Sequence, residues 1–210
     1  MRALAIIDVQ NDFMPGGHLE VHCGDIIIPV INRLQKHFEL VVATQDWHPG
    51  NHKSFASNHP GKKPFDRIIL KGTDQVLWPD HCIQGSYGAE FHPGLETGRI
   101  AAIFRKGMDP EIDSYSGFFD NGHLISTGLS GYLKEKGVTE VAFCGLASDI
   151  CVYHTIKDSI GEGFISVLIE DASQPLDKDS FTGIKKELIK MGARVFTSEE
   201  YISSGESAEE

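Results

Sequence analysis

The run Leu4-Ala5-Ile6-Ile7 is short, continuous and apolar, and it ends abruptly at Asp8. Runs of this kind, rich in β-branched residues, are typical of strands buried on both faces of a parallel sheet. Further runs recur at residues 40–43, 68–70, 100–104, 141–144 and 165–169, with a weaker one at 194–196. We therefore expect a mostly parallel central sheet of about six strands.

Stripes of apolar residues at helical spacing lie between several of these runs. They are Ile27/Ile31/Leu34/Phe38, Val152/Ile156/Ile160 and Phe181/Ile184/Leu188/Met191. Pro29 fits the first turn of the first helix, and Gly192 follows the third stripe as a helix stop. The alternation of strands and helices predicts an α/β fold, with a three-layer α/β/α arrangement that is Rossmann-like.

The chain has 210 residues, of which 40% are apolar, so it can bury a core without disulfides. We expect one domain over residues 1–202 and a polar tail over residues 203–210. A net charge of −11 without a Lys/Arg cluster disfavours nucleic acid as a partner. The first apolar run is too short for a signal peptide or a membrane span, which predicts a cytoplasmic protein with no membrane partner. Monomer and homo-oligomer both stay open.

Polar residues follow several of the predicted strands at the point where each strand ends. Asp8 ends the first run, Asp46 and His48 follow the second, and Lys106 follows residues 100–104. Cys151 comes after residues 141–144, across a short turn. Because parallel sheets bind ligands beyond the carboxyl ends of their strands, we expect these side chains to meet at one edge.

Cys151 is a candidate nucleophile among four cysteines that show no CxxC pairing and are expected to be free thiols. Ser148 is a suitable N-cap and would place Cys151 in the first helical turn, where the helix dipole favours the thiolate. Amide groups there and at Ala147 could stabilise an oxyanion. Asp8 could accept the thiol proton, and Lys106 could hold both groups in their charged forms. The plainer alternative is a cysteine packed in a strand–helix turn, with an ordinary turn aspartate and an exposed lysine.

Two short segments have the character of metal-ligand motifs: residues 45–48, Gln-Asp-Trp-His, and residues 78–81, Trp-Pro-Asp-His. In an extended segment Asp46 and His48 lie on the same side, as two ligands of one ion require. One carboxylate and two imidazoles suit zinc, iron or manganese, and three protein ligands leave positions open for water or substrate. The long irregular stretch 49–64 could form a flap over this site. Surface Asp and His are common, so the spacing alone leaves solvated side chains as an alternative.

Taken together, the motifs resemble the nicotinamidase branch of the isochorismatase-like cysteine hydrolases. The resemblance runs from Asp8 to about Asp171, and the order and spacing of its motifs make it specific. The motifs are Asp8-Val9-Gln10-Asn11-Asp12-Phe13, Gln45-Asp46-Trp47-His48-Pro49, Trp78-Pro79-Asp80-His81-Cys82, Lys106-Gly107, Asp113-Ser114-Tyr115-Ser116-Gly117-Phe118, and Gly145-Leu146-Ala147-Ser148-Asp149-Ile150-Cys151-Val152.

The resemblance implies a role for each matching residue. It implies a catalytic triad of Asp8, Lys106 and Cys151, and an oxyanion hole formed by the backbone amides of Ala147 and Cys151. The family carries a cis peptide bond just before the residue that matches Ala147. The resemblance further implies metal ligation by Asp46, His48 and His81, with His52 at the place of a further ligand in some relatives. It also implies a sandwich of the substrate's pyridine ring by Phe13, Trp78 and Tyr115.

The function implied by the resemblance is that of a metal-containing cysteine amidase. It would hydrolyse nicotinamide, its small-molecule substrate, to nicotinate and ammonia in NAD salvage, and pyrazinamide would be a second substrate. One divalent ion is expected, with zinc favoured and iron or manganese as alternatives.

Three rival functions stay open at this point. Another small-amide hydrolase, acting on ureido or carbamoyl compounds, is disfavoured by the metal-ligand set. Isochorismatase proper is disfavoured by Cys151, which its vinyl-ether chemistry does not need. A non-catalytic metal or ligand binder is disfavoured by the complete triad. Ile150 and the Gln174-Pro175 segment depart from the family pattern and bear on the shape of the pocket.

Overall fold

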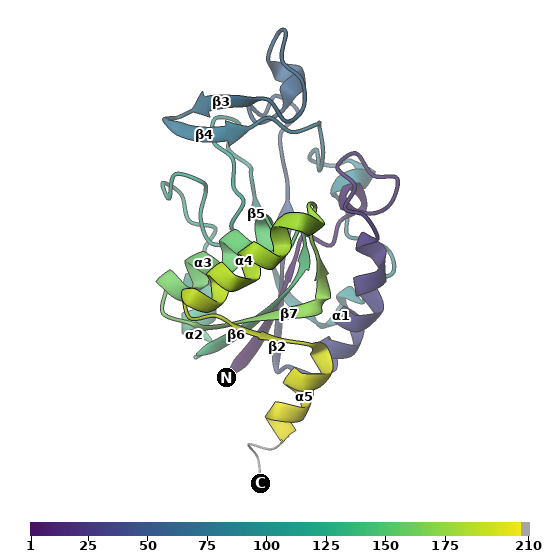
Figure 1. Cartoon of the computed structure of the whole chain (residues 1–210), viewed down its shortest axis with the longest axis vertical. Coiled ribbons are helices and arrows are strands. Elements are labelled where there is room, and N and C mark those ends of the chain that lie inside the picture. Colours follow the sequence, from purple (N-terminus) through teal and green to yellow (C-terminus); the bar gives the residue numbers. More distant parts are fainter. Residues whose placement is uncertain (207–210) are drawn as a thin grey trace.

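The computed structural model describes residues 1–206 and is built around a six-stranded sheet. Its strands are β1 (Arg2–Ile7), β2 (Leu40–Asp46), β5 (Ile100–Lys106), β6 (Glu140–Leu146), β7 (Ile165–Gln174) and β8 (Arg194–Phe196). They lie in the order β5-β2-β1-β6-β7-β8, and each neighbouring pair is parallel. The predicted α/β fold with a parallel sheet is confirmed (Figure 1).

This strand order contains a reversal that determines where a ligand can bind. The chain moves outward from β1 through β2 to β5, and then returns to the other side of β1 to form β6, β7 and β8. In doubly wound sheets the crevice lies beyond the carboxyl ends of the strands, at the point where the order reverses. Here that point lies between β1 and β6, the two strands that lead into Asp8 and into the turn before Cys151.

Five α-helices cover the two faces of the sheet among the described residues. They are α1 (Ile28–Leu34), α2 (Leu129–Glu135), α3 (Cys151–Gly161), α4 (Lys178–Lys190) and α5 (Ser198–Glu206). Leu4 and Ile6 of β1 pack in the core that contains α1, whereas Ala5 and Ile7 pack in the core that contains α2 and α3. Both faces of the central strand are therefore buried, as its continuous apolar run predicts. Short 3-10 helices occur at Asn11–Phe13, Gly24–Ile27, Gln35–His37, Ala56–Asn58, Tyr87–Ala89 and Thr97–Arg99.

The apolar run at residues 68–70 lies outside the central sheet, so its prediction as a buried sheet strand was wrong. It forms β3 (Arg67–Leu70), which pairs antiparallel with β4 (Thr73–Val76) in a separate hairpin. The connecting residues Lys71 and Gly72 have φ of 50° and 83°, which is the backbone conformation of a tight hairpin turn. Ile69 is 70% exposed. Figure 1 shows the hairpin projecting from the end of the sheet that carries the strand-end residues.

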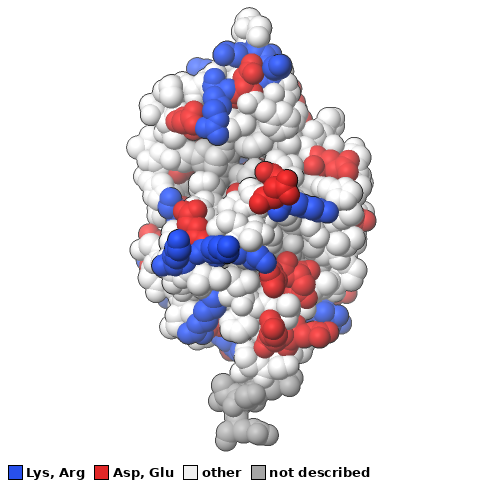
Figure 2. All heavy atoms as spheres, in the orientation of Figure 1, with Lys and Arg blue, Asp and Glu red and all other residues white. Residues whose placement is uncertain are grey.

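Two helices, α2 and α5, were not predicted from the apolar pattern. The predicted polar tail begins inside α5, which extends to Glu206, and residues 207–210 lie outside the described residues. On the face drawn in Figure 2, basic and acidic side chains are interspersed rather than separated into large areas of one sign. None of the described helices combines the length and the apolar character needed to cross a bilayer.

Candidate active site

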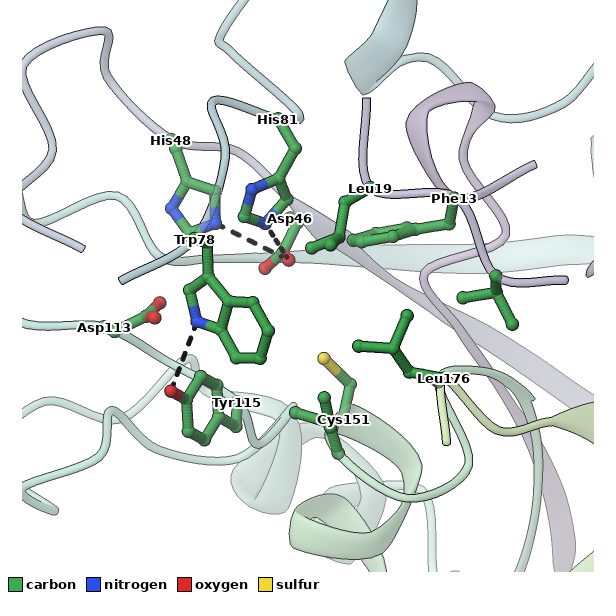
Figure 3. Close-up of a pocket in the computed structure, with 13 residues that line it drawn as sticks. Phe13, Leu19, Asp46, His48, Trp78, His81, Asp113, Tyr115, Cys151 and Leu176 are labelled. Atoms are coloured by element: carbon green, nitrogen blue, oxygen red, sulfur yellow. Dashed lines mark hydrogen bonds and ion pairs between the residues drawn. The ribbon is translucent and has the colours of Figure 1, made fainter. Parts of the chain in front are cut away.

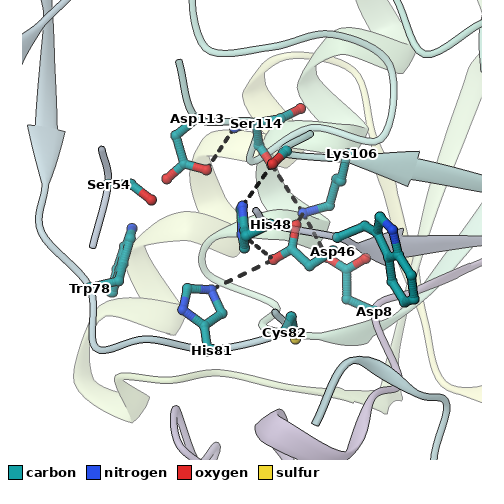
Figure 4. Close-up of polar contacts among 12 residues, drawn as sticks. Asp8, Asp46, His48, Ser54, Trp78, His81, Cys82, Lys106, Asp113 and Ser114 are labelled. Carbon is teal, nitrogen blue, oxygen red and sulfur yellow. Dashed lines mark hydrogen bonds and ion pairs between the residues drawn. The ribbon is translucent and has the colours of Figure 1, made fainter. Parts of the chain in front are cut away.

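The strand-end residues meet in a buried polar cluster around Lys106, the last residue of β5. Its Nζ lies 2.9 Å from Asp8 Oδ2 and 2.5 Å from Asp46 Oδ1, and it donates hydrogen bonds to the Ser114 carbonyl at 3.0 Å and to Cys151 Sγ at 3.5 Å. Lys106 is only 2% exposed. Figure 4 shows its ammonium group between the two aspartates. The predicted convergence of these side chains at one sheet edge is therefore present in the structure.

The two carboxylate oxygens of Asp8 have different surroundings. Oδ1 accepts a hydrogen bond of 2.6 Å from the hydroxyl of Thr44, whereas Oδ2 accepts no hydrogen bond within residues 1–206 despite its ion pair with Lys106. Ligand atoms of Asp8, Asp46 and Cys151 all lie within 4.8 Å of one another. Asp8 Oδ2 therefore has the capacity to accept a proton, and the thiol is nearby.

Burial dominates the protonation of this cluster. Burial raises the pKa of the Cys151 thiol well above its usual value, and the nearby Lys106 ammonium only partly offsets this. Burial also raises the pKa of Asp8, again against the influence of Lys106. Burial alone would lower the pKa of Lys106, but Asp46 and Asp8 outweigh it and raise that pKa. The resting cluster therefore contains a thiol and a charged lysine. Burial thus opposes the stabilisation of the thiolate that the helix start favours, because desolvation disfavours the anion.

The turn from β6 into α3 places Cys151 as the first residue of the helix. Gly145 precedes the turn with φ of 122°, and a Cβ atom there would lie 2.1 Å from the Ile7 carbonyl, so only glycine fits. The Leu146–Ala147 peptide bond is cis, as the resemblance implies. The prediction of Ser148 as N-cap was wrong. Ile150 occupies that position, and the Ser148 hydroxyl has no hydrogen-bond partner within the described chain.

Asp46, His48 and His81 form a second buried cluster beside the first. Asp46 Oδ2 lies 3.5 Å from His48 Nε2 and 3.8 Å from His81 Nε2. The other nitrogen of each ring, Nδ1, bonds to a backbone carbonyl, that of Gly107 at 2.9 Å for His48 and that of Pro79 at 2.8 Å for His81. This pattern is characteristic of metal-binding histidines, whose outer nitrogen is fixed by a hydrogen bond. The donor set therefore fits a divalent cation.

The charges in this second cluster bear on metal binding. Burial would raise the pKa of Asp46, but Lys106 and the two imidazoles outweigh it and hold the pKa well below its usual range. Burial, together with the neighbouring His48, lowers the pKa of His81 to about 4, so its imidazole is neutral near pH 7. Burial disfavours a proton on His48, yet the Asp46 carboxylate raises its pKa, so a proton and a cation compete for that ring.

One cavity connects the two clusters with a set of rings. Among the residues that line it are Cys151, Ala147, Asp46, His48 and His81. The predicted ring-binding residues Phe13, Trp78 and Tyr115 line the same cavity. Figure 3 shows the Cys151 sulfur facing the space between the Trp78 and Phe13 side chains, with the metal-ligand candidates on the far side. The arrangement places a nucleophile, a cation site and aromatic surfaces within reach of one small molecule.

Comparisons with known proteins agree with this geometry. Residues 2–200 match the isochorismatase domain. The chain belongs to the isochorismatase family. It is 48% identical to a nicotinamidase of Acinetobacter baylyi over 93% of this chain and 92% of the relative. The solved structure of an Acinetobacter baumanii nicotinamidase-pyrazinamidase superposes with a TM-score of 0.93 at 48% identity and covers 95% of this chain and 97% of that one. A Pyrococcus horikoshii pyrazinamidase solved in complex with zinc gives a TM-score of 0.79 at 35% identity, over 93% of this chain and 98% of that one.

Within this isochorismatase fold, His52 lies beside the metal-ligand candidates. It is fully buried, and its ring centroid is 4.6 Å from that of His48. Its Nδ1 accepts a hydrogen bond of 3.1 Å from the Ser54 amide, while Nε2 has no hydrogen-bond partner among the described residues. Ligand atoms of His48, His52 and Asp113 lie within 4.8 Å of one another. His52 of the stretch 49–64 thus packs against the metal-ligand candidates, while no residue of that stretch lines the cavity, and a flap over the site stays a prediction.

Several residues of the site were missed by sequence reasoning. Thr44 bonds Asp8, Gln75 bonds Tyr115, and Asp113 lines the cavity. Asp113 belongs to the motif of residues 113–118, but neither the spacing nor the resemblance assigns a role to this carboxylate. Thr44 and Gln75 had no distinguishing signal, since neither belongs to a predicted strand or to a quoted motif. Leu19, Val21, Leu176 and Ile150 are further apolar residues of the lining, so Ile150 does bear on the shape of the pocket.

Proposed function

We propose that the chain hydrolyses nicotinamide to nicotinate and ammonia, the reaction of a nicotinamidase (EC 3.5.1.19), and that it also accepts pyrazinamide. The observation that carries the proposal is the position of Cys151. It lies beside Asp8 and Lys106 and faces a cavity that also holds a metal-ligand cluster and aromatic rings. The relatives named above carry this activity in their names. Free cysteines suit a reducing compartment, so we place the reaction in the cytoplasm, in NAD salvage.

In the first half of the proposed mechanism, Asp8 Oδ2 accepts the proton of the Cys151 thiol as the sulfur attacks the carboxamide carbon. Lys106 favours the negative charge on both groups and holds Asp8 in place. The backbone amides of Ala147 and Cys151 donate hydrogen bonds to the carbonyl oxygen as it becomes an oxyanion. Asp8 then passes its proton to the departing nitrogen, the C–N bond breaks, and ammonia leaves a thioester on Cys151.

In the second half, a water molecule attacks the thioester carbon while Asp8 accepts one of its protons. The C–S bond breaks, Asp8 returns the proton to the sulfur, and nicotinate leaves. Asp8 thus acts twice as base and twice as acid, which requires a carboxylate oxygen with a lone pair open to the thiol and to water. Oδ2 meets this requirement, since Thr44 occupies only Oδ1.

For the metal we propose one divalent ion, zinc, held by Asp46, His48 and His81, with His52 as a candidate further ligand. Iron and manganese suit the same donors. Support comes from the buried donor set and from the zinc complex of the Pyrococcus horikoshii relative. When bound, the cation supplies positive charge that attracts the ring nitrogen of the substrate. Phe13, Trp78 and Tyr115 supply the faces and edges against which the ring packs.

The test is an assay of the purified protein with nicotinamide, with ammonia and nicotinate both quantified and metal content measured on the same sample. We expect equal amounts of the two products, and activity that falls on chelation and returns with zinc. N-carbamoyl amino acids, offered in parallel, test the rival ureido and carbamoyl chemistry. Metal-loaded protein that releases ammonia only from the carbamoyl compounds, or from neither, would overturn the proposed function.

A further inference from the structure

Gln75 is a buried polar residue that no motif singles out. It lies in β4, the second strand of the hairpin that projects beyond the central sheet, and it is only 2% exposed. Its side-chain nitrogen has three acceptors that share its two N–H groups: the Tyr115 hydroxyl and Asp113 Oδ2, both at 2.9 Å, and the Val76 carbonyl at 2.8 Å. The hairpin therefore reaches into the site through one side-chain amide.

The partners of Gln75 line the cavity. Trp78 Nε1 donates to the same Tyr115 hydroxyl at 3.3 Å, and the two rings meet edge to face with centroids 6.1 Å apart. The Tyr115 oxygen thus accepts two hydrogen bonds, one from the hairpin and one from Trp78. Figure 3 shows Trp78, Tyr115 and Asp113 grouped on the same side of the cavity. The Tyr115 oxygen therefore links the orientations of the Tyr115 and Trp78 rings. Gln75 bonds this oxygen from outside the cavity.

Gln75 also fixes the carboxylate of Asp113. Oδ2 accepts from Gln75, and Oδ1 accepts from the Ser114 amide at 2.8 Å, so each carboxylate oxygen has a donor. Without Gln75, a 3% exposed carboxylate would lose a donor close to the His48 ring. A buried charged group left without its donor moves or draws in water.

We propose that Gln75 is a positioning residue for ring recognition: it holds Tyr115 and Asp113, and through Tyr115 also Trp78, in the arrangement that receives a heteroaromatic carboxamide. This deepens the proposed function, because it assigns affinity for the ring to the hairpin and the chemistry to the strand ends. Gln75 does not line the cavity, so it acts only through its partners.

The test replaces Gln75 by leucine, which keeps a similar volume and removes both donors. We expect the KM for nicotinamide to rise roughly tenfold while kcat stays within about twofold, since a donor to a charged acceptor and a ring contact are lost but the strand ends are untouched. Alkylation of Cys151 by iodoacetamide, a small amide without a ring, should keep its rate within about twofold. General disruption of the site would change both measurements. Gln84→Leu is the matched control, because the side chain of this exposed glutamine donates to the Trp47 carbonyl and lies outside the cavity lining.

A second measurement separates this inference from the proposed function. In the Cys151→Ala background, calorimetry gives the Kd of pyridine-3-carboxaldehyde without covalent capture, and adding Gln75→Leu should weaken it roughly tenfold. This readout needs no turnover, so it tests Gln75 even if nicotinamide is not the substrate. If the leucine variant does not fold, Gln75→Glu takes its place. This variant keeps the side-chain shape but places a carboxylate against Asp113, so it should weaken binding of the aldehyde further. An unchanged KM and Kd, or an equal loss in the iodoacetamide reaction, would overturn the inference.

Discussion

The two sides of the cavity are built in different ways. Asp8, Asp46, Lys106 and Cys151, the strand-end side, lie at or just past the ends of β1, β2, β5 and β6, whose positions are set by the central sheet. Trp78, Tyr115 and Gln75, the ring side, come from the hairpin and from irregular segments, and side-chain hydrogen bonds tie them together. The difference teaches that the residues proposed for catalysis are held by backbone pairing in the sheet, whereas the residues proposed for ring binding are held by a few side-chain hydrogen bonds between loops. Loops on a rigid scaffold are where specificity changes most readily.

The largest effect expected from this comparison is the loss of the nucleophile. Cys151→Ala removes the proposed nucleophile and should lower kcat for nicotinamide by at least about a thousandfold, with little change in thermal stability. The measurement is ammonia release with a matched melting curve. Cys23→Ala is the control, since this half-buried cysteine lies outside the cavity and should leave turnover unchanged. If the Cys151 variant still turns over nicotinamide at a tenth of the normal rate, the reaction does not proceed through a thioester on Cys151.

The next effect is on stability and arises from the buried charges. Lys106→Met leaves the carboxylates of Asp8 and Asp46 without their cation, so the free energy of unfolding should fall by about 3–5 kcal/mol, as for other broken buried pairs. Urea denaturation measures it. Lys53→Met is the matched control: its pair with Glu111, at 2.7 Å, has side chains 47% and 40% exposed. That exposed pair should contribute less than about 1 kcal/mol. Equal losses in the two variants would contradict the view that burial sets the energetics of the strand-end side.

The same division explains what the sequence could predict. The apolar runs placed the central strands correctly, and the residues just after them, Asp8, Asp46 and Lys106, were expected together because parallel strands end at one edge. The position of Cys151 at the helix start followed from the same reasoning, but the effect of burial on its thiol pKa did not. Charge on a thiol depends on desolvation by residues distant in sequence, which a local pattern such as a helix start does not reveal.

The ring side was less predictable, for a physical reason. An apolar run of the same composition can form a buried sheet strand or one strand of an exposed hairpin. Residues 68–70 form a hairpin strand. Gln75 then became buried through tertiary contacts alone, with Asp113 and Tyr115 about 40 residues away, and no periodicity marks such a contact. Trp78 and Tyr115 were found only through the family resemblance.

A smaller effect is expected from Thr44, which supports Asp8 from within β2. Thr44→Val keeps the shape and removes the 2.6 Å hydrogen bond to Asp8 Oδ1. Loss of a bond to a charged acceptor should lower kcat/KM for nicotinamide roughly tenfold, mainly through kcat, because the base is less well held. Thr139→Val, at an exposed position, makes the same chemical change as a control. An effect confined to KM would place Thr44 with ring recognition and would break the division between the two sides.

The smallest effect is expected at the rim of the ring side. Phe65 is 62% exposed in the segment before β3 and meets the Trp78 ring edge to face, with centroids 6.1 Å apart. Phe65→Ala should raise the KM for nicotinamide only about threefold, the size of one aromatic contact, and should change stability by less than about 1 kcal/mol. Ile69→Ala, 70% exposed on the same hairpin, serves as the control and should change neither quantity. Steady-state kinetics of both variants beside Gln75→Leu rank the contributions. If Phe65→Ala raises the KM more than Gln75→Leu does, the exposed Phe65 ring controls the orientation of Trp78. The buried amide of Gln75 would then have the smaller role on the ring side.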